Sequence, residues 1–255
     1  MHFVDAVILL TGSSRGIGEA IAYRLAASGA AVVLHGRDVH RLAAVGSARG
    51  AKALAVDLGE DGAPERLADR AIEVYGRVVA VVRCAGVGWY GDVWRMSAAD
   101  LDRILTVNLL APVQLTRCLL PPMIEAGRGH VAFVGSIAGL TSVAQESVYS
   151  AAKAGVSTFA DSLRLELSRA GVGVSVLSPG AVDTEFWESR GAPDQRAIPR
   201  LISPERVAEL AVRDIERDRA HRIMPRWLGI AALAHTALPR TYRRLALAFG
   251  TNLAG

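Results

Sequence analysis

The most constraining feature of this sequence is an apolar run that leads directly into a glycine-rich turn. Residues 6–11 are Ala-Val-Ile-Leu-Leu-Thr, and the turn that follows is Gly12-Ser-Ser-Arg-Gly16-Ile-Gly18. A continuous apolar run is typical of a parallel strand buried on both faces. A glycine turn between such a strand and a helix lets backbone N–H groups approach a pyrophosphate. The T-G-x-x-x-G-x-G spacing also fits a merely tight turn, but its place after a first strand favours nucleotide binding.

Strand-like and helical segments alternate along most of the 255 residues, of which 51% are hydrophobic. This alternation predicts one doubly wound parallel α/β sheet of the Rossmann type, in a single domain over residues 1–255 with a helical C-terminal extension. A capping box at Ser97 opens a long helix that runs toward Leu120. Pro121-Pro122 and the glycines at 127 and 129 are expected to break the chain before the strand at 131–134. The strands are expected at residues 6–11, 31–34, 53–56, 78–82, 131–134 and 172–177.

Charge and cysteine content bear on the cellular compartment of the protein and on whether it binds a metal. The net charge is +4, and 27 arginines stand against only two lysines, Lys52 and Lys153. Cys84 and Cys118 are the only cysteines, too few to cross-link the fold or to supply a metal site, which favours a reducing compartment. We therefore expect a cytoplasmic protein without a bound metal.

A tyrosine and a lysine are spaced for acid–base chemistry in the segment Tyr149-Ser-Ala-Ala-Lys153. Residues four apart on a helix lie on one face. A phenol has a pKa of roughly 10, and an ammonium group nearby favours the phenolate and lowers that pKa. Ser136, thirteen residues upstream, could orient a carbonyl or alcohol beside the phenol. The Y-x-x-x-K spacing by itself is common, so its meaning depends on the surrounding sequence.

The end of the second expected strand bears on the choice of nucleotide. His35-Gly36-Arg37 has no carboxylate before Asp38, whereas an acidic residue there would bind a ribose 2′-hydroxyl. Arg37 and Arg15 could together hold a 2′-phosphate, which predicts NADP(H) over NAD(H); the alternative is two solvated surface arginines. Asp57 could accept a hydrogen bond from the adenine amino group, or it could simply cap the end of the third strand.

Together these segments resemble the short-chain dehydrogenase/reductase family of the single-domain type with roughly 250 residues. Each motif is weak alone, but they occur in the family's order across residues 5–185. The matching motifs are Thr11-Gly12-x-x-x-Gly16-x-Gly18, Ala85-Gly86, Asn108, Ser136, Tyr149-x-x-x-Lys153 and Pro179-Gly180-x-Val182-x-Thr184.

The resemblance implies a role for each matching residue. Tyr149 would be the general acid in carbonyl reduction and the general base in alcohol oxidation, and Lys153 would lower its pKa and bind the nicotinamide ribose. Ser136 would hold the substrate oxygen, and Asn108 would anchor a water that relays protons. The cofactor would be bound by Gly12, Ser14, Arg15, Gly16, Ile17, Gly18, Arg37, Asp57, Leu58, Ala85, Gly86, Tyr149, Lys153, Pro179, Gly180, Val182 and Thr184.

The sequence departs from the family's pattern in two places. Arg83-Cys84 replaces the usual Asn-Asn, which puts the bracing of the sheet by the first asparagine in doubt, and Cys84 is expected to be a small buried residue. The common C-terminal Val-Asp-Gly-Gly strand is absent, and His221–Met224 could be a shortened equivalent. A homodimer or homotetramer is expected, with pairing through the Tyr149 helix.

The loops after the later strands are largely apolar and aromatic, at residues 87–90, 137–143 and 186–187. They fit a hydrophobic ketone, aldehyde or alcohol above the nicotinamide. The predicted function is an NADP(H)-dependent oxidoreductase. The alternative is a catalytically silent NADP(H)-binding sensor of the same fold, and neither needs nucleic acid as a partner.

The segment 219–255 differs in composition from the rest of the chain. No acidic residue follows Asp218, whereas six arginines do. One interpretation is a pair of amphipathic helices packed on the body; a peripheral membrane contact or docking partner is another. A nucleic-acid surface is a third, although no recognised binding module accompanies the arginines. The six are Arg219, Arg222, Arg226, Arg240, Arg243 and Arg244.

Overall fold

The computed structural model describes residues 1–47, 51–191 and 201–250, and its centre is a seven-stranded sheet in the order β3-β2-β1-β4-β5-β6-β7. All neighbouring strands pair in parallel, which confirms the predicted doubly wound sheet. The strand order reverses between β1 and β4, the point where such sheets bind ligands. The strands are β1 (Val7–Thr11), β2 (Ala31–Gly36), β3 (Lys52–Ala55), β4 (Ala80–Arg83), β5 (Gly129–Val134), β6 (Val172–Pro179) and β7 (His221–Met224).

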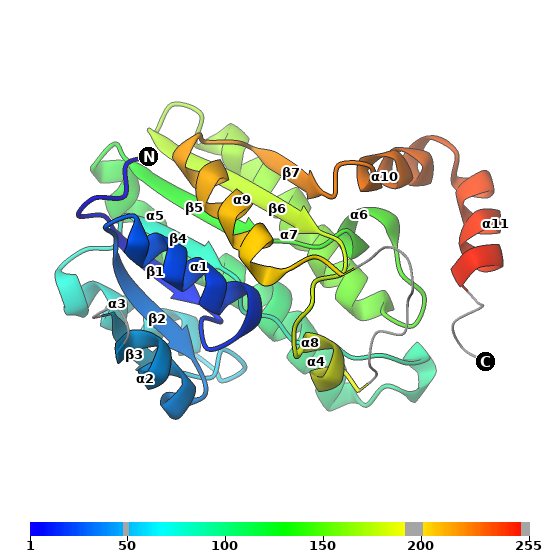
Figure 1. Ribbon diagram of the computed structural model, residues 1–255, viewed down its shortest axis with the longest axis horizontal. Helices are drawn as coiled ribbons and strands as arrows, with labels where there is room; N and C mark the ends of the chain where they lie inside the picture. The colour runs from blue at the N-terminus through cyan, green and yellow to red at the C-terminus, as the bar shows by residue number, and fades with distance from the viewer. Residues whose placement is uncertain (48–50, 192–200, 251–255) are drawn as a thin grey trace.

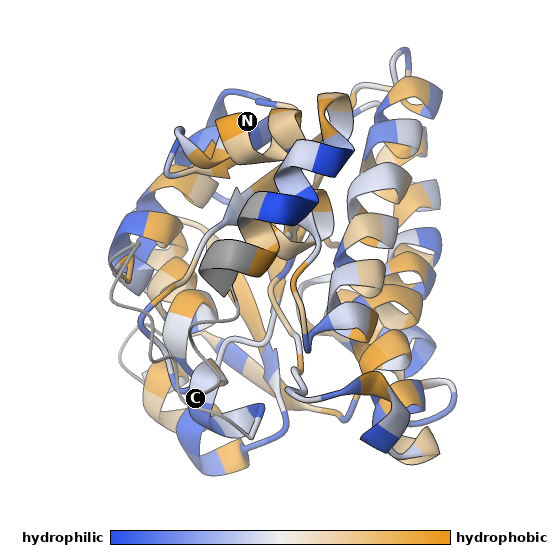
Figure 2. Cartoon of the chain, turned by 90° about the vertical axis from the view of Figure 1, so that its right-hand side faces the viewer, coloured by the Kyte–Doolittle hydropathy of each residue, from blue (hydrophilic) through white to orange (hydrophobic). Residues whose placement is uncertain are grey.

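Helices cover both faces of the sheet because the central strands are apolar on both sides (Figure 1). One face is covered by α1 (Gly16–Ala27), α2 (Val39–Ser47) and α9 (Pro204–Glu216). The other is covered by α3 (Ala63–Tyr75), α5 (Ala111–Glu125) and α7 (Ser147–Glu166). Figure 2 shows the mostly apolar strands enclosed between these helical layers.

The long helix predicted from Ser97 is present but interrupted. It consists of α4 (Ala98–Leu105), the π-helical segment η2 (Thr106–Leu110) and α5. The expected break at Pro121-Pro122 is wrong, because both prolines lie inside α5. Two prolines this close to the end remove only two N–H donors, and the helix ends instead before Gly127, one of the two glycines expected to break the chain, which has φ +60.

The stretch Ala98–Glu125 is long and apolar enough to cross a membrane by length and composition alone. Its residues Ala111, Leu115, Leu119 and Met123 are instead buried against the sheet. It therefore serves here as a core helix. Three short elements lie in the loops that follow β4, β5 and β6, namely η1 (Val93–Arg95), α6 (Ala138–Thr141) and α8 (Phe186–Ser189).

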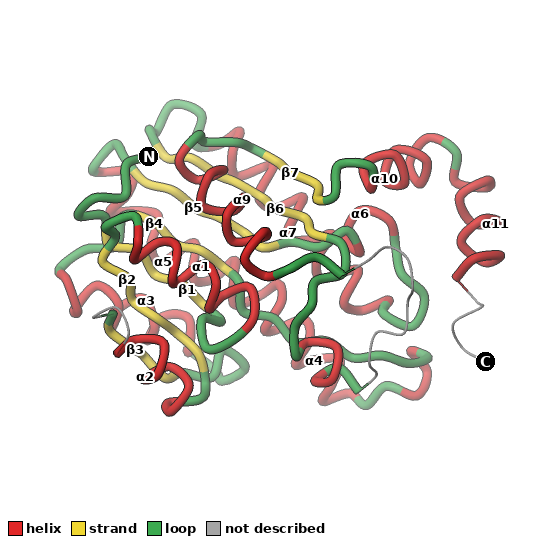
Figure 3. Tube along the Cα trace, in the orientation of Figure 1, coloured by secondary structure: helices red, strands yellow, loops and turns green. Residues whose placement is uncertain are grey.

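The C-terminal segment begins with the shortened strand expected at His221–Met224, which pairs with β6 as β7. Arg219 and Arg222 both pair with buried Asp214, so these two arginines belong to the body of the fold. The helices α10 (Leu228–Ala237) and α11 (Pro239–Gly250) then extend away from the sheet (Figure 3). α10 contacts α6 and β7, and α11 packs on α10. The end of the predicted C-terminal segment, residues 251–255, lies outside the described residues.

Candidate functional site

A single cleft runs along the carboxyl ends of β1 to β6, where the strand order reverses, and it contains nearly every predicted site residue. Asn108 is the exception, since it lies buried just behind the cleft wall. The predicted residues that line the cleft are Gly12, Ser14, Arg15, Gly16, Ile17, Gly18, Arg37, Asp57, Leu58, Ala85, Gly86, Ser136, Tyr149, Lys153, Pro179, Gly180, Val182 and Thr184.

The glycine turn brings bare backbone to one wall of the cleft. Gly12 has φ +70, and a Cβ atom there would lie 2.6 Å from the Ala85 Cα. A Cβ on Gly18 would lie 2.0 Å from the Gly12 carbonyl oxygen, so neither position can carry a side chain. α1 starts at Gly16, and its first N–H groups have no side-chain cap. This narrow cradle at a helix N-terminus fits the pyrophosphate of a dinucleotide.

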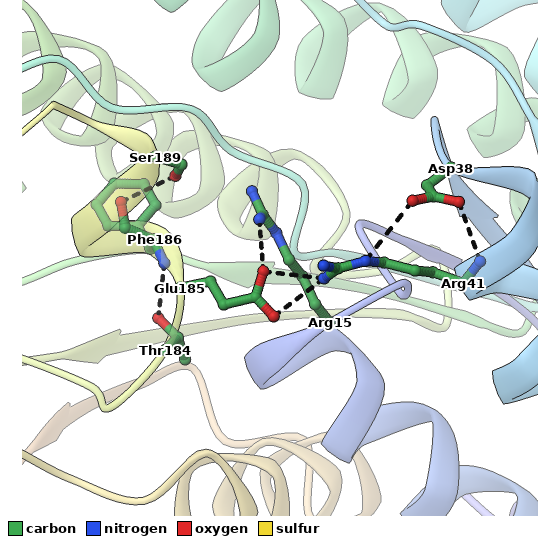
Figure 4. A network of polar contacts seen from close by, with 7 residues as sticks. All are labelled: Arg15, Asp38, Arg41, Thr184, Glu185, Phe186 and Ser189. Atoms are coloured by element: carbon green, nitrogen blue, oxygen red, sulfur yellow. Dashed lines mark hydrogen bonds and ion pairs between the residues drawn. The ribbon is translucent and has the colours of Figure 1, made fainter.

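Two arginines gather around one carboxylate, that of Glu185, near the end of β2 (Figure 4). Glu185 accepts a 2.9 Å hydrogen bond from Arg15 and two bonds of 2.9 and 3.0 Å from Arg41. These two guanidinium groups hold the pKa of Glu185 below its usual value. The carboxylate is in effect a stand-in anion, and its position shows that Arg15 and Arg41 can converge on one negative group.

Arg37 does not join that cluster, although the sequence pairs it with Arg15. Its guanidinium lies 3.9 Å from the Asp57 carboxylate and is 57% exposed. Asp57 in turn accepts hydrogen bonds from Arg103 at 3.0 and 3.1 Å and from the Gly59 N–H at 2.9 Å. Partial burial acts to raise the pKa of Asp57, but these bonds lower it overall. Asp57 therefore caps the strand end while also lining the cleft.

The other end of the cleft holds Tyr149 and Lys153, both from α7. The Lys153 Nζ lies 5.7 Å from the centre of the Tyr149 ring and donates a 3.0 Å bond to the Val134 carbonyl. Burial raises the pKa of Tyr149 to about 12, while a hydrogen bond with Ser136 acts to lower it. Burial lowers the pKa of Lys153 to about 8. The predicted lowering of the Tyr149 pKa is not seen in the protein alone, because desolvation exceeds the favourable contacts.

Ser136 and Asn108 hold the loops around that tyrosine. Ser136 follows β5, and its Oγ accepts a 3.1 Å bond from the Ala138 N–H. The Asn108 amide exchanges two bonds with the Val87 backbone, at 3.1 and 2.8 Å, and donates a third to the Ile104 carbonyl at 3.0 Å. A Cβ on Gly86 would lie 2.9 Å from Asn108 Oδ1 and 3.8 Å from Lys153 Nζ. Asn108 thus fixes the loop after β4 next to Lys153.

Arg83, in place of the family's asparagine, is 3% exposed at the end of β4. Among the described residues its three side-chain nitrogens have no hydrogen-bond partner, and its guanidinium lies 4.8 Å from the Phe133 ring centre. Desolvation lowers the pKa of Arg83 to about 9. The bracing between strands comes instead from Thr11, whose hydroxyl accepts bonds from the Cys84 and Ala85 N–H groups at 3.2 Å. Desolvation raises the pKa of Cys84 to about 12, which keeps its thiol protonated.

The predicted substrate loops meet beside Tyr149. The Phe186 ring lies 5.6 Å from the Tyr149 ring, and Val87, Val143 and Trp187 line the same end of the cleft. The sequence gives no signal for five further charged residues that the fold brings to the cleft or to its wall, one of which is the Arg103 that binds Asp57. The other four are Arg41, Glu146, Glu185 and Arg190, and the partners of all five lie 44 to 170 residues away in the sequence.

Comparison with known proteins agrees with this geometry. The sequence profile described as short chain dehydrogenase matches residues 6–195. Ketoacyl reductase HetN of Nostoc sp. is 33% identical over 251 residues, covering 92% of this chain and 88% of that protein.

Solved structures match over nearly the whole chain. A short-chain dehydrogenase from Sphingobium yanoikuyae in complex with NADPH has a TM-score of 0.81 at 27% identity, covering 92% of this chain and 95% of the other. A short-chain dehydrogenase/reductase from Burkholderia phymatum in complex with NAD has a TM-score of 0.83 at 26% identity, covering 94% and 96%. The chain therefore belongs to the short-chain dehydrogenase/reductase family of oxidoreductases, which act on alcohol and carbonyl groups.

Proposed function

We propose that this protein is an NADP(H)-dependent oxidoreductase that interconverts a hydrophobic ketone or aldehyde and its alcohol. One observation carries the proposal. Tyr149, Lys153 and Ser136 converge at one end of a cleft whose other end is rich in arginine. A dinucleotide laid along the glycine turn would place its nicotinamide beside Tyr149 and its adenosine phosphate beside the arginines.

When bound, NADP(H) supplies the hydride, and the side chains of the cleft supply orientation and one proton. Because burial raises the Tyr149 pKa to about 12, the phenol is protonated at neutral pH and suited to donate a proton in carbonyl reduction. Ser136 would hold the substrate oxygen toward that phenol. Lys153, held by the Val134 carbonyl, would bind the ribose and favour the phenolate that forms.

NADP(H) is favoured over NAD(H) by the charges around the adenosine end. β2 ends at Gly36 without a carboxylate, and Arg15, Arg37, Arg41 and Arg103 lie nearby. A 2′-phosphate would form charge-assisted hydrogen bonds with such a group of guanidinium donors. The related structures contain either NADPH or NAD, so family membership leaves this choice to the residues of this chain.

The decisive experiment follows NADPH oxidation across a panel of aliphatic and aromatic ketones and aldehydes, with Tyr149→Phe as the matched variant. We expect the variant to lose roughly 100-fold or more of the rate with NADPH affinity unchanged, because it lacks only the proton donor. Tight NADPH binding without turnover of any carbonyl would instead favour the silent sensor.

The substrate is proposed to be apolar because Val87, Val143, Phe186 and Trp187 form its compartment. We also propose a homodimer or homotetramer that forms through α7 and a cytoplasmic location. Light scattering coupled to gel filtration tests the first, and fractionation of cells tests the second.

We further propose a peripheral membrane contact through α10 and α11. Trp227, Ile230, Leu233 and Leu238 are more than half exposed there. The arginines 226, 240, 243 and 244 surround them without a nearby acidic residue in the sequence, a combination that suits an anionic lipid surface. Cosedimentation with phosphatidylserine vesicles tests the contact, using a chain truncated after Pro225 so that β7 is kept. Equal binding by both chains would contradict it.

A further inference from the structure

The wall of the substrate compartment contains an ion pair that is almost wholly withdrawn from water. Arg190 pairs with Glu146, and the two side chains are only 6% and 9% exposed. The Arg190 guanidinium also lies over two aromatic rings, 4.3 Å from the centre of Trp187 and 4.8 Å from that of Tyr90. Stacking of this kind restricts where the guanidinium can lie.

The pair joins three loops that come from different strands. Arg190 directly follows α8 after β6, Glu146 directly precedes α7, and Tyr90 lies in the loop after β4. The Tyr90 N–H donates to the Arg190 carbonyl at 3.1 Å, and the Gly91 N–H donates to the Gln145 carbonyl at 3.0 Å. Arg190 is therefore the point at which the three loops meet.

The loop after β4 packs directly on α8. A Cβ atom on Gly88 would lie 2.7 Å from the Phe186 ring and 2.9 Å from the Arg190 Cβ. The same helix places the Phe186 ring against Tyr149, and Glu146 lines the cleft three residues before Tyr149. The position of Arg190 thus determines how closely α8 lies over the reacting end of the cleft.

The energetics of buried charge point to a positioning role. Desolvation offsets most of the attraction within a buried ion pair, so such a pair contributes little to stability compared with apolar side chains. Removing one partner, in contrast, leaves an uncompensated charge inside the protein. The pair therefore acts chiefly by restricting geometry, since its direction and the two stacked rings fix where Arg190, and with it the end of α8, lies.

We infer that Arg190 and Glu146 are positioning residues that hold α8 closed over Tyr149 and so determine which substrates fit the compartment. The inference rests on the proposed oxidoreductase function for its kinetic consequence. Its structural consequence, a closed α8 segment, stands independently of turnover.

The test compares the wild-type chain with Glu146→Gln/Arg190→Met, which removes both charges and leaves neither unpaired. Hydrogen exchange of residues 185–191 is expected to accelerate about tenfold or more, because the stacked guanidinium and its bond to Glu146 no longer fix α8 against the two other loops. With the best carbonyl substrate found in the panel, KM is expected to rise about tenfold while kcat changes less than about threefold. The control is Glu65→Gln/Arg117→Met, which removes an exposed ion pair of 2.9 Å between α3 and α5.

The outcomes are separable. Unchanged exchange and unchanged KM in the double variant overturn the inference, as does an equal response in the control. If the double variant loses its thermal transition, the test is repeated with Arg190→Lys, which keeps the charge and removes the stacked guanidinium. Faster exchange throughout the chain, and not only at residues 185–191, then overturns the inference. Lack of turnover by the wild-type chain counts against the proposed function alone, because the exchange measurement needs no substrate.

Discussion

Glu185 and Arg41 are joined by two hydrogen bonds of 2.9 and 3.0 Å, across 144 residues of sequence and across the mouth of the cofactor cleft. Arg15 binds the same carboxylate, so Glu185 occupies two of the guanidinium groups that a 2′-phosphate would use. Glu185→Gln is therefore expected to tighten NADPH binding. Since both side chains are about half exposed, the gain should be modest, about threefold, and should shrink with added salt.

Titration of intrinsic fluorescence with NADPH at low and high salt measures this gain. Glu60→Gln, which removes an exposed ion pair to Arg66 between two side chains that do not line the cleft, is the matched control. Weaker NADPH binding by Glu185→Gln would mean that the carboxylate helps to retain the cofactor and does not compete with it.

Cofactor preference is predicted to reverse in Gly36→Asp/Arg37→Ala. A carboxylate at the end of β2 would bind a ribose 2′-hydroxyl and repel a 2′-phosphate. We expect the ratio of NADPH to NADH affinity to fall at least about tenfold. A Cβ on Gly36 would lie 3.3 Å from Ser14 Oγ, so Gly36→Ala is the control for crowding in the turn. A ratio equal to that of the wild-type chain would contradict NADP(H) specificity.

The folded protein should lose stability on mild acidification because two histidines are buried in neutral form. Burial lowers the pKa of His35 and of His130 to about 4, and both are 2% exposed. The unfolded chain binds protons below pH 6.5, whereas the folded chain does not until about pH 4. Their contribution is thus complete above pH 6.5 and decreases as the pH falls toward 4, by about 1.4 kcal/mol per pH unit for each histidine.

Urea unfolding at pH 5 and pH 7.5 measures this loss. The difference between the two pH values should be smaller in His130→Gln, and it should be unchanged in His40→Gln, since His40 is exposed. Identical pH dependence in both variants would exclude His130 as a source of acid sensitivity.

Arg83→Met is expected to stabilise the fold. The guanidinium lies inside the protein with no hydrogen-bond partner in the part of the chain that the structure describes, and methionine fills a similar volume without a charge. The free energy of unfolding should rise by about 2 kcal/mol. The control Arg95→Met removes a guanidinium that is 76% exposed and should change little. A lower melting temperature in Arg83→Met would reveal a stabilising partner for this side chain.

The features that sequence predicts well are those set by neighbouring residues. An apolar run followed by a glycine turn determines β1 and the start of α1, and the spacing from Tyr149 to Lys153 places both on one helix. The shortened strand at His221–Met224 is predicted only from the family's pattern, because His-Arg-Ile-Met contains no apolar run.

The remaining features depend on residues that are distant in sequence. The Arg190–Glu146 pair and the Glu185 cluster join loops from separate strands, so no local pattern reports them. Whether the Tyr149 pKa is raised or lowered depends on how deeply the side chain is buried, and the spacing between Tyr149 and Lys153 carries no information about burial. Pro121-Pro122 were misleading for a similar reason, because tertiary packing of Met123 keeps the last turn of α5 helical.

The π-helical segment η2 changes the rotational position of the side chains in α5 relative to those in α4. One additional residue in a helix rotates everything beyond it by about 100°. This offset directs the Asn108 side chain inward, where it reaches the Ile104 carbonyl, and it leaves Leu115 and Leu119 facing the sheet. A π-turn accommodates one residue more than an α-turn, so deleting a single residue between 106 and 110 would close it into regular α-helix and move Asn108 away from the Val87 and Ile104 carbonyls that it binds. This stretch should therefore tolerate substitutions far better than changes in length.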